Sequence, residues 1–236
     1  MSLADDLTAE VVKILKEQWT VRQGRQVPDT PDLKLANDAV TLSGTVLYAD
    51  LADSTGLVAS SKAAFAAEVY KSYLNCACRI ITANGGTITA FDGDRVMAVY
   101  LGESKNTDAM KSALQINHAV LDIINPKIRE TYPYTPSGFS VRQAVGVDTS
   151  DLFVARTGIR GSNDLVWVGN AANIAAKLCG LRSDPYASWI SAAVYDGAAD
   201  SVKLGGQNNS QQMWERRSWT ARGGATVYAS KWKWKP

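Results

Sequence analysis

Hydrophobic and polar residues follow two different spacings along this 236-residue chain, and the spacings predict where helices and strands lie. Near the N-terminus, apolar residues recur every three to four positions and predict an amphipathic helix over residues 3–19. Residues 21–37 hold two prolines and little periodicity, which indicates an extended connector. We therefore expect a helix and connector over residues 1–39, followed by the main domain over residues 40–236.

The main domain opens with the signals of alternating strands and helices. The apolar run 44–51 predicts a buried strand, and the alanine-rich periodicity of 60–86 predicts a helix that closes at Asn84-Gly85-Gly86. Two alternating runs on either side of Asp92-Gly93 predict a β-hairpin, because this dipeptide readily adopts the tight turn. The expected order is thus strand, helix and hairpin.

The second half of the domain repeats these signals. A helix is expected over TDAMKSALQINHAVLDIINPKI, then strands at GFSVRQAVGVDTS, DLFVARTG and DLVWVG, then a helix over 170–181 with Asn170 as its N-cap. The remainder suggests short strands at the edge of one sheet. Together these elements predict an α+β fold with a mainly antiparallel sheet and helices on one face.

Composition narrows the possible functions. The chain has 25 Lys and Arg against 23 Asp and Glu, a net charge of +2, so no basic surface indicates a nucleic-acid partner. No secretory leader and no apolar run of spanning length is found, and we expect a cytoplasmic protein without membrane insertion. The single histidine, His118, and the three cysteines are assigned to packing. Carboxylates therefore have to carry most of the chemistry.

Two aspartates stand out as candidate cation ligands. Asp50 ends the first buried strand and Asp94 follows the hairpin turn, so they can meet if those strands are neighbours. Mg²⁺ and Mn²⁺ are commonly held by one or two carboxylates together with substrate phosphates, which points to a nucleoside triphosphate. The alternative is that Asp94 is an ordinary turn residue and Asp50 a strand-end cap.

Three stretches occur in order along the chain: YADLADST, FDGDRVMAV and VGNAANIAAK. Together they resemble the signature stretches of class III nucleotidyl cyclases, over roughly residues 44–230. The resemblance implies a ferredoxin-like cyclase fold and two divalent cations, Mn²⁺ or Mg²⁺. It implies Asp50, the Leu51 carbonyl and Asp94 as metal ligands. It also places Ser54 and Thr55 where the loop meets the triphosphate.

The third stretch resembles the family helix that carries a ribose-orienting asparagine and a transition-state arginine. These positions hold Asn173 and Lys177, so charge stabilisation is expected to persist without the bidentate fork of arginine. A looser match places Arg222 where the family often has a phosphate-binding lysine. Because each family site combines residues of two subunits, the resemblance implies a homodimer with two shared sites. The alternative interpretation is that Asn173 and Lys177 lie on a solvated helix surface.

At the positions that correspond to the base-selecting residues of purine cyclases, this sequence has Ala90 and Val166. Neither side chain can hydrogen-bond a base. Arg95 and Tyr48 instead place two bulky donors beside the metal residues, where a smaller base would fit. Alone, either residue has an ordinary structural explanation. Together with the VPDTPDL connector they resemble the pyrimidine cyclases of Pycsar antiphage systems, which implies cyclic UMP or cyclic CMP as a signal for a downstream effector.

We expect UTP as the substrate, because donor-only Arg95 suits the two carbonyl groups of uracil. CTP is the close alternative. A second hypothesis is a non-catalytic cyclase-like domain that binds a nucleotide and dimerises, suggested by Lys177 and the missing purine pair. A diguanylate cyclase or polymerase palm shares the two-metal topology, but the chain has no G-G-D-E-F signature.

Overall fold

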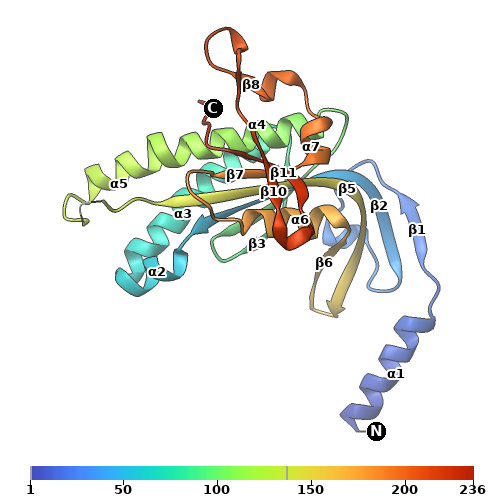
Figure 1. Cartoon of the computed structure of the whole chain (residues 1–236). Helices are drawn as coiled ribbons and strands as arrows, with labels where there is room; N and C mark the ends of the chain where they lie inside the picture. Colours follow the sequence, from blue (N-terminus) through green and yellow to red (C-terminus); the bar gives the residue numbers. More distant parts are fainter. Residues whose placement is uncertain (1, 137) are drawn as a thin grey trace.

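The computed structural model describes residues 2–136 and 138–236. A mixed sheet forms the centre of the molecule, with strand order β10-β11-β7-β5-β2-β4-β3, β1 added beside β2 and β6 beside β5. Most neighbours are antiparallel, but β1–β2 and β5–β7 are parallel. The long strands β2 and β5 pair over fourteen positions, from Ala39–Ala155 to Ala52–Arg142, and run through the middle of the fold in Figure 1.

Most strands and helices follow one another in the predicted order, but the strands expected separately at GFSVRQAVGVDTS and DLFVARTG form the single strand β5, and the expected connector contains β1. The strands are β1 Thr20–Gln23, β2 Asp38–Ala52, β3 Thr87–Asp92, β4 Arg95–Tyr100, β5 Arg142–Ile159, β6 Ser162–Val168, β7 Ser188–Ser191, β8 Leu204–Gly205, β9 Gln211–Gln212, β10 Glu215–Trp219 and β11 Ala225–Ser230. The helices are α1 Leu3–Lys16, α2 Ser54–Ser60, α3 Ala63–Ala83, α4 Lys105–His118, η2 Ala119–Ile124, α5 Asn125–Thr131, α6 Asn170–Cys179 and α7 Ala192–Asp196, with short 3-10 turns η1 Thr30–Asp32, η3 Asp200–Val202, η4 Gln207–Asn209 and η5 Thr220–Arg222.

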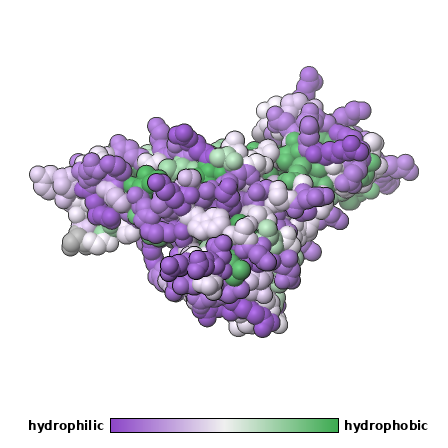
Figure 2. All heavy atoms as spheres, turned by 90° about the horizontal axis from the view of Figure 1, so that it is seen from above, coloured by the Kyte–Doolittle hydropathy of each residue, from purple (hydrophilic) through white to green (hydrophobic). Residues whose placement is uncertain are grey.

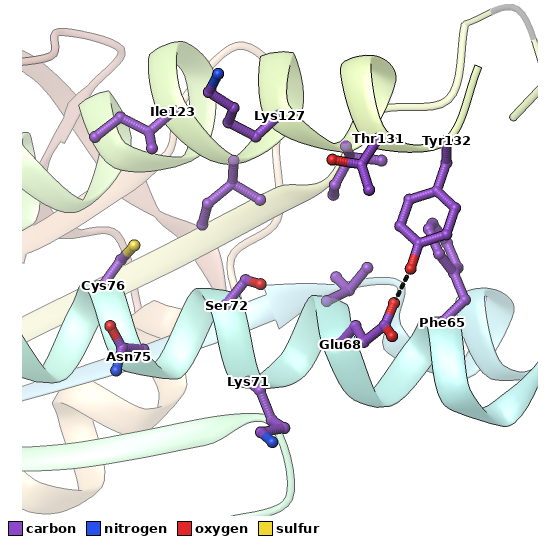
Figure 3. Close-up of a pocket in the computed structure, with 13 residues that line it drawn as sticks. Phe65, Glu68, Lys71, Ser72, Asn75, Cys76, Ile123, Lys127, Thr131 and Tyr132 are labelled. Atoms are coloured by element: carbon purple, nitrogen blue, oxygen red, sulfur yellow. Dashed lines mark hydrogen bonds between the residues drawn. The ribbon is translucent and has the colours of Figure 1, made fainter.

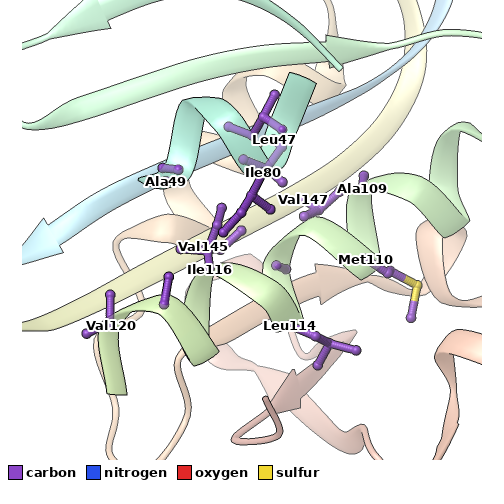
Figure 4. Close-up of a cluster of buried hydrophobic side chains, with 14 of the residues drawn as sticks. Leu47, Ala49, Ile80, Ala109, Met110, Leu114, Ile116, Val120, Val145 and Val147 are labelled. Atoms are coloured by element: carbon purple, nitrogen blue, oxygen red, sulfur yellow. The ribbon is translucent and has the colours of Figure 1, made fainter. Parts of the chain in front are cut away.

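Helices α3 and α4 cover one face of the sheet. Alternate residues of β2, Leu47, Ala49 and Leu51, point into this layer and are almost fully buried. They meet Tyr73 and Ile81 from α3, and Figure 4 shows the same cluster reaching α4 and β5. The prediction of a helix over 60–86 is confirmed, since α3 ends at Ala83 and is followed by Gly85 with φ of +80°.

Helix α6 covers the opposite face, so the prediction of helices on one face is wrong. Val46 on β2 belongs to a separate cluster with Ala171, Ala172 and Ala175 of α6. The close approach depends on Gly146 of β5, where a β-carbon would lie 2.1 Å from the Ala175 carbonyl oxygen. Small residues on both elements therefore let a second helical layer form.

The N-cap of α6 also differs from expectation. Gly169 is the capping position and Asn170 is already the first helical residue. A β-carbon on Gly169 would lie 2.6 Å from the Asp151 carbonyl oxygen, so the entry to α6 needs glycine. The prediction of Asn170 as N-cap is wrong, because backbone crowding puts glycine at the capping position and the Ser150 hydroxyl accepts from the Ala171 N–H at 2.9 Å.

The N-terminal segment is partly integrated into the sheet. Helix α1 is present as predicted and extends away from the body in Figure 1. The expected connector contains β1, which pairs in parallel with residues 38–41 of β2. Asn37 ties α1 to this strand by donating to the carbonyls of Ile14 and Glu17, both at 2.8 Å. The boundary between residues 39 and 40 stays a prediction.

The surface is mostly polar. Hydrophilic atoms predominate in the view from above, with limited hydrophobic patches between them (Figure 2). In the described part of the chain, no helix is both long enough and apolar enough to cross a bilayer. The free cysteines are Cys76, Cys78 and Cys179, and burial raises the pKa of the Cys179 thiol to about 12. This is the inert packing role expected for Cys179.

Candidate active site

The register of β2 and β4 brings the two candidate aspartates to one end of the sheet. Asp50 lies directly opposite Arg95, and Asp94 is the residue that precedes Arg95 in the turn. The hairpin of β3 and β4 is thus the element that positions Asp94. Asp50 itself is only 4% exposed although it is a carboxylate. A buried acid of this kind needs a cationic partner, a hydrogen bond or a bound cation.

Asp50 has two arginine partners on the same oxygen. Arg182 Nη2 lies 2.5 Å from Asp50 Oδ2, and Arg95 Nη2 lies 3.3 Å from it. Arg182 belongs to the loop between α6 and β7, 132 positions away in the sequence. Sequence reasoning missed this residue, because a lone arginine in a loop carries no motif or periodicity. The guanidinium groups neutralise a carboxylate that would otherwise be buried alone.

Unpartnered polar atoms surround the same end of the sheet. Among the described residues, Asp94 Oδ2, Arg95 Nε and the Tyr73 hydroxyl are buried without a hydrogen-bond partner. Burial raises the pKa of Tyr73 well above its usual value, and the carboxylates of Asp50 and Asp94 raise it further. Buried groups of this kind are rare unless another species completes their bonding. Asp94 Oδ2 is therefore an oxygen ligand available to a cation.

The donor set fits a hard divalent cation. Asp50 and Asp94 supply carboxylate oxygens, and the backbone carbonyl of Leu51 follows Asp50 in the chain, one residue before the end of β2. No cluster of three or more His, Cys, Asp or Glu residues that could hold a metal is found across residues 2–136 and 138–236. Two carboxylates suit Mg²⁺ or Mn²⁺, which are completed by phosphates and water rather than by an all-protein cage. The residues therefore fit cations that enter with a nucleotide.

The loop after β2 forms the wall of a small cavity whose lining includes Leu51, the residue that follows Asp50. Asp53 adopts a left-handed conformation with φ of 60°, which turns the chain from β2 into α2. A cavity of about 220 Å³ is lined by Ser54 and by residues of the loop before β5. An adjoining cavity of about 200 Å³ is lined by Asp53, Arg142 and Arg182. Thr55 is exposed on the first turn of α2.

Asn173 and Lys177 lie on α6, on the face turned away from the sheet. The helix buries Ala171, Ala172, Ala175, Leu178 and Cys179, whereas Asn173 and Lys177 are exposed. They share one helix face as the spacing of four predicts. Within a single chain they therefore point away from the sheet on which their own Asp50 lies. The structure does not bring all the sequence-predicted site residues together in one chain.

The candidate base-recognition residues lie beside Asp50. Tyr48 shares the Asp50 face of β2, and the Arg95 guanidinium lies 6.0 Å from the centre of its ring. Burial raises the pKa of Tyr48, with a smaller opposing effect from Arg95. Arg95 thus contacts both the aromatic ring and the Asp50 carboxylate. Val166 is 38% exposed on β6, whereas Ala90 lies half-buried on β3.

In the folded chain, Arg222 lies away from Asp50. It ends η5, between β10 and β11, which lie at the opposite edge of the sheet from β3 and β4. Its guanidinium lies 5.8 Å from the Trp219 ring centre. It also lowers the pKa of Asp148, whose pKa is nevertheless raised overall because burial is the larger effect.

A larger groove lies elsewhere, between α3 and the η2–α5 segment (Figure 3). Its volume is about 670 Å³, and its lining includes Phe65, Ile123 and Lys127. The Tyr132 hydroxyl donates a hydrogen bond to Glu68 at one end of the groove. The groove contains neither Asp50 nor Asp94. Its size alone does not make it the reaction site, because the paired carboxylates and arginines lie at the end of β2 and β4.

Comparison with known proteins identifies the family. The chain is 47% identical to a uridylate cyclase of Xanthomonas perforans, over all of this chain and 99% of that protein. It is 49% identical to a uridylate cyclase of Burkholderia cepacia, over 99% of each chain. The chain belongs to the uridylate cyclase family. It is a nucleotidyl cyclase, as the three sequence stretches predicted.

Solved structures agree with this assignment at the level of the fold. The cyclase superimposes on the guanylyl cyclase Cya2 with a TM-score of 0.66 and 16% identity, covering 83% of this chain and 95% of that one. It matches the adenylyl cyclase CyaB from P. aeruginosa with a TM-score of 0.66 and 19% identity, covering 81% and 95%. No family model matches the cyclase. The class III cyclase fold is thus confirmed.

Proposed function

We propose that this cyclase converts UTP into 3′,5′-cyclic UMP and pyrophosphate, as a homodimer with two composite active sites. The observation that carries the proposal is near-complete coverage at 47% and 49% identity to two uridylate cyclases. The buried Asp50 and the unpartnered Asp94 oxygen support it independently, because they supply what a cation–triphosphate complex requires.

The metal ligands and the residues that contact the triphosphate are assigned to the first half-site. Asp50, Asp94 and the Leu51 carbonyl would hold two divalent cations, Mn²⁺ or Mg²⁺. Bound cations of this kind would lower the pKa of the ribose 3′-hydroxyl and neutralise phosphate charge. Ser54 and Thr55 line the approach to the triphosphate. With the phosphates held in this way, the 3′-oxygen would form its bond to the α-phosphorus as the bond to the departing pyrophosphate breaks.

The second half-site is assigned to the partner subunit. Asn173 would orient the ribose, and Lys177 would balance the negative charge that builds up at the α-phosphate. Arg222 would contact the outer phosphates. Exposure of Asn173 and Lys177, on the α6 face away from their own sheet, supports contribution to a neighbouring site. A monomer should therefore be inactive.

Base choice is assigned to Tyr48 and Arg95. Both are donors beside Asp50, and the guanidinium can serve the uracil carbonyl oxygens. CTP remains the second candidate substrate, because cytosine also offers carbonyl and ring-nitrogen acceptors. The resemblance to antiphage cyclases further suggests that the product is a second messenger, read by a separate cyclic-nucleotide effector.

Product analysis tests the proposal. The full chain is incubated with Mn²⁺ and each of the four nucleoside triphosphates, and products are identified by mass spectrometry. We expect cyclic UMP from UTP and loss of at least a hundredfold in the Asp50→Ala and Asp94→Ala variants, since each removes a metal ligand. Cyclic CMP as the main product would support the second candidate. No cyclic product from any nucleotide would favour a binding-only domain.

Turnover retained by both aspartate variants would overturn the metal assignment. Size-exclusion chromatography and circular dichroism of the same preparations serve as the control, because they separate lost chemistry from lost folding or assembly. The in vivo role is tested separately by measuring cyclic UMP in cells before and after phage challenge. A product level that does not rise on challenge would contradict the role in defence while leaving the enzyme assignment intact.

A further inference from the structure

The Asp50–Arg182 ion pair occupies the place where the first cation is expected. Arg182 Nη2 bonds Asp50 Oδ2 at 2.5 Å, the shorter of the two arginine contacts on that oxygen. The Asp50 side chain is 6% exposed, whereas that of Arg182 is 38% exposed. A buried anion is thus neutralised by a cation that reaches it from a solvent-facing loop.

The two arginines differ in how firmly they are held. Arg95 begins β4, lies in register opposite Asp50 and stands over the Tyr48 ring. Arg182 lies beyond the end of α6, in a loop held by the local bonds Arg182 N–H to Gly180 O and Ser183 N–H to Leu181 O. Its guanidinium forms no second ion pair in the described part of the chain. Arg182 is therefore the group that can leave with the smaller structural cost.

The charges make it unfavourable for Arg182 and a divalent cation to occupy the site together. Asp50 and Asp94 carry two negative charges, and Arg95 and Arg182 already balance them. A dication placed on Asp50 would lie within a few ångströms of the Arg182 guanidinium, where like charges repel strongly in a partly buried site. Phosphate groups would relieve this repulsion because they supply new negative charge.

We propose that Arg182 is a displaceable counter-ion, which holds Asp50 in the metal-free cyclase and yields to the divalent cation that enters with the nucleotide. The inference rests on the proposed function and adds a regulation of the same site. Arg182 acts through Asp50 and is therefore a positioning residue. This displacement couples metal binding to nucleotide binding. The metal binds weakly to the free protein and more tightly when a nucleotide is present.

Metal binding to the full chain tests the inference without relying on turnover. Mn²⁺ affinity is measured by isothermal titration calorimetry, with and without 3′-deoxy-UTP, an analogue that cannot cyclise because it lacks the attacking hydroxyl. Arg182→Gln is expected to bind Mn²⁺ about tenfold more tightly than wild type when no nucleotide is present, because the competitor is gone. With the analogue bound, the two proteins should differ much less, so the variant loses most of the coupling.

Arg142→Gln is the matched control. It removes the same charge from the lining of the same cavity, but Arg142 pairs with the exposed Asp184 at 2.8 Å and not with Asp50. We expect its Mn²⁺ affinity to stay within about threefold of wild type, because charges at exposed sites are screened. An equal gain in both variants would overturn the inference, since general electrostatics would then explain it.

Thermal unfolding supplies a second readout. In EDTA, Arg182→Gln should lower the Tm, and saturating Mn²⁺ with the analogue should remove most of that difference. In an Asp50→Asn background the same substitution should no longer lower the Tm, because the pair is already broken. A Tm loss that is the same in both backgrounds would assign Arg182 a structural role elsewhere and overturn the inference.

The experiment separates failure of the counter-ion role from failure of the metal site. Equal Mn²⁺ affinity of wild type and Arg182→Gln, with clear binding in both, would overturn the counter-ion role and leave the proposed function standing. Absence of Mn²⁺ binding in both proteins, even with the analogue, would overturn the metal site and with it the counter-ion.

Discussion

Gly146 of β5 lies directly against the backbone at Ala175 of α6, and a β-carbon on Gly146 would stand 2.1 Å from the Ala175 carbonyl oxygen. This contact sets how closely α6 packs on the sheet. The Cys179 thiol reinforces it by donating to the Ala144 carbonyl at 3.2 Å. The close approach at Gly146, together with the Cys179 contact, therefore helps to position the exposed face of α6 with Asn173 and Lys177.

Gly146→Ala is expected to destabilise the protein by about 3 kcal/mol, because the added methyl meets backbone that cannot rotate away. Chemical denaturation measures the change. Gly161→Ala is the control: nothing lies within 4 Å of its β-carbon, although its φ of +86° carries a backbone cost of about 1 kcal/mol. A smaller loss for Gly146→Ala than for Gly161→Ala would contradict the packing argument.

Mixing inactive subunits tests whether the active site is shared. Asp50→Ala and Lys177→Ala homodimers are each expected to be inactive. An equal mixture, unfolded and refolded together, should recover about a quarter of wild-type activity, because half of the dimers are mixed and each holds one intact site. Cyclic nucleotide formation per milligram is the measurement. No recovery, with mixed dimers confirmed by differential tagging, would place both residues in one chain's site.

Tyr73→Phe is expected to raise the free energy of unfolding by about 1 kcal/mol. The Tyr73 hydroxyl is buried without a hydrogen-bond partner among the described residues, so its removal ends a desolvation cost and leaves the ring in place. Urea unfolding of metal-free protein checks this. A destabilisation of similar size would indicate that the hydroxyl has a partner in solution.

Asp148 is expected to make stability depend on pH. Burial raises its pKa above the ordinary value of 3.8, despite opposing hydrogen bonds from Ser191 and Thr149. The folded state therefore binds a proton more readily than the unfolded state, and stability falls as pH rises from about 4 through the folded pKa. Asp148→Asn should make the free energy of unfolding depend less on pH over this range and should raise it at pH 7. Denaturation from pH 4 to 7 tests it, and an unchanged slope would contradict the assignment.

Arg95→Ala is expected to lower kcat/KM for UTP and also to reduce discrimination between UTP and ATP by at least tenfold, since the proposed donor to uracil is lost. Arg95 also bonds Asp50 at 3.3 Å, so a general loss of rate is expected as well. The ratio of kcat/KM values separates the two effects. An unchanged ratio would mean that Arg95 supports Asp50 without reading the base.

Local patterns predicted several structural features of the candidate site. The hairpin around Asp92-Gly93 was predicted from a turn dipeptide. In the structure Asp94 directly precedes Arg95, the residue of β4 that lies opposite Asp50 on β2. The pairing of Asn173 with Lys177 on one face of α6 followed from a spacing of four. Each inference needs only neighbours within a few positions, where periodicity and turn chemistry act.

Other features could not be predicted from local patterns. Strand β1 was expected to be a connector, because four residues that pair through backbone hydrogen bonds need no distinctive side chains. Arg182 was missed because nothing in its neighbourhood indicates that it reaches a carboxylate 132 positions away. The placement of α6 on the second face depended on Gly146, a glycine that gives no sign in sequence of the helix it contacts.

The amino-acid sequence by itself predicted the order of most strands and helices and the candidate carboxylate pair, because these follow from residue types and short spacings, and its resemblance to class III cyclases predicted the kind of chemistry. Only the tertiary structure decided which groups neutralise Asp50, which face α6 covers and which way Asn173 and Lys177 point. Those outcomes depend on side chains distant in sequence that meet when two long strands pair, and on the demand that a buried charge find a partner.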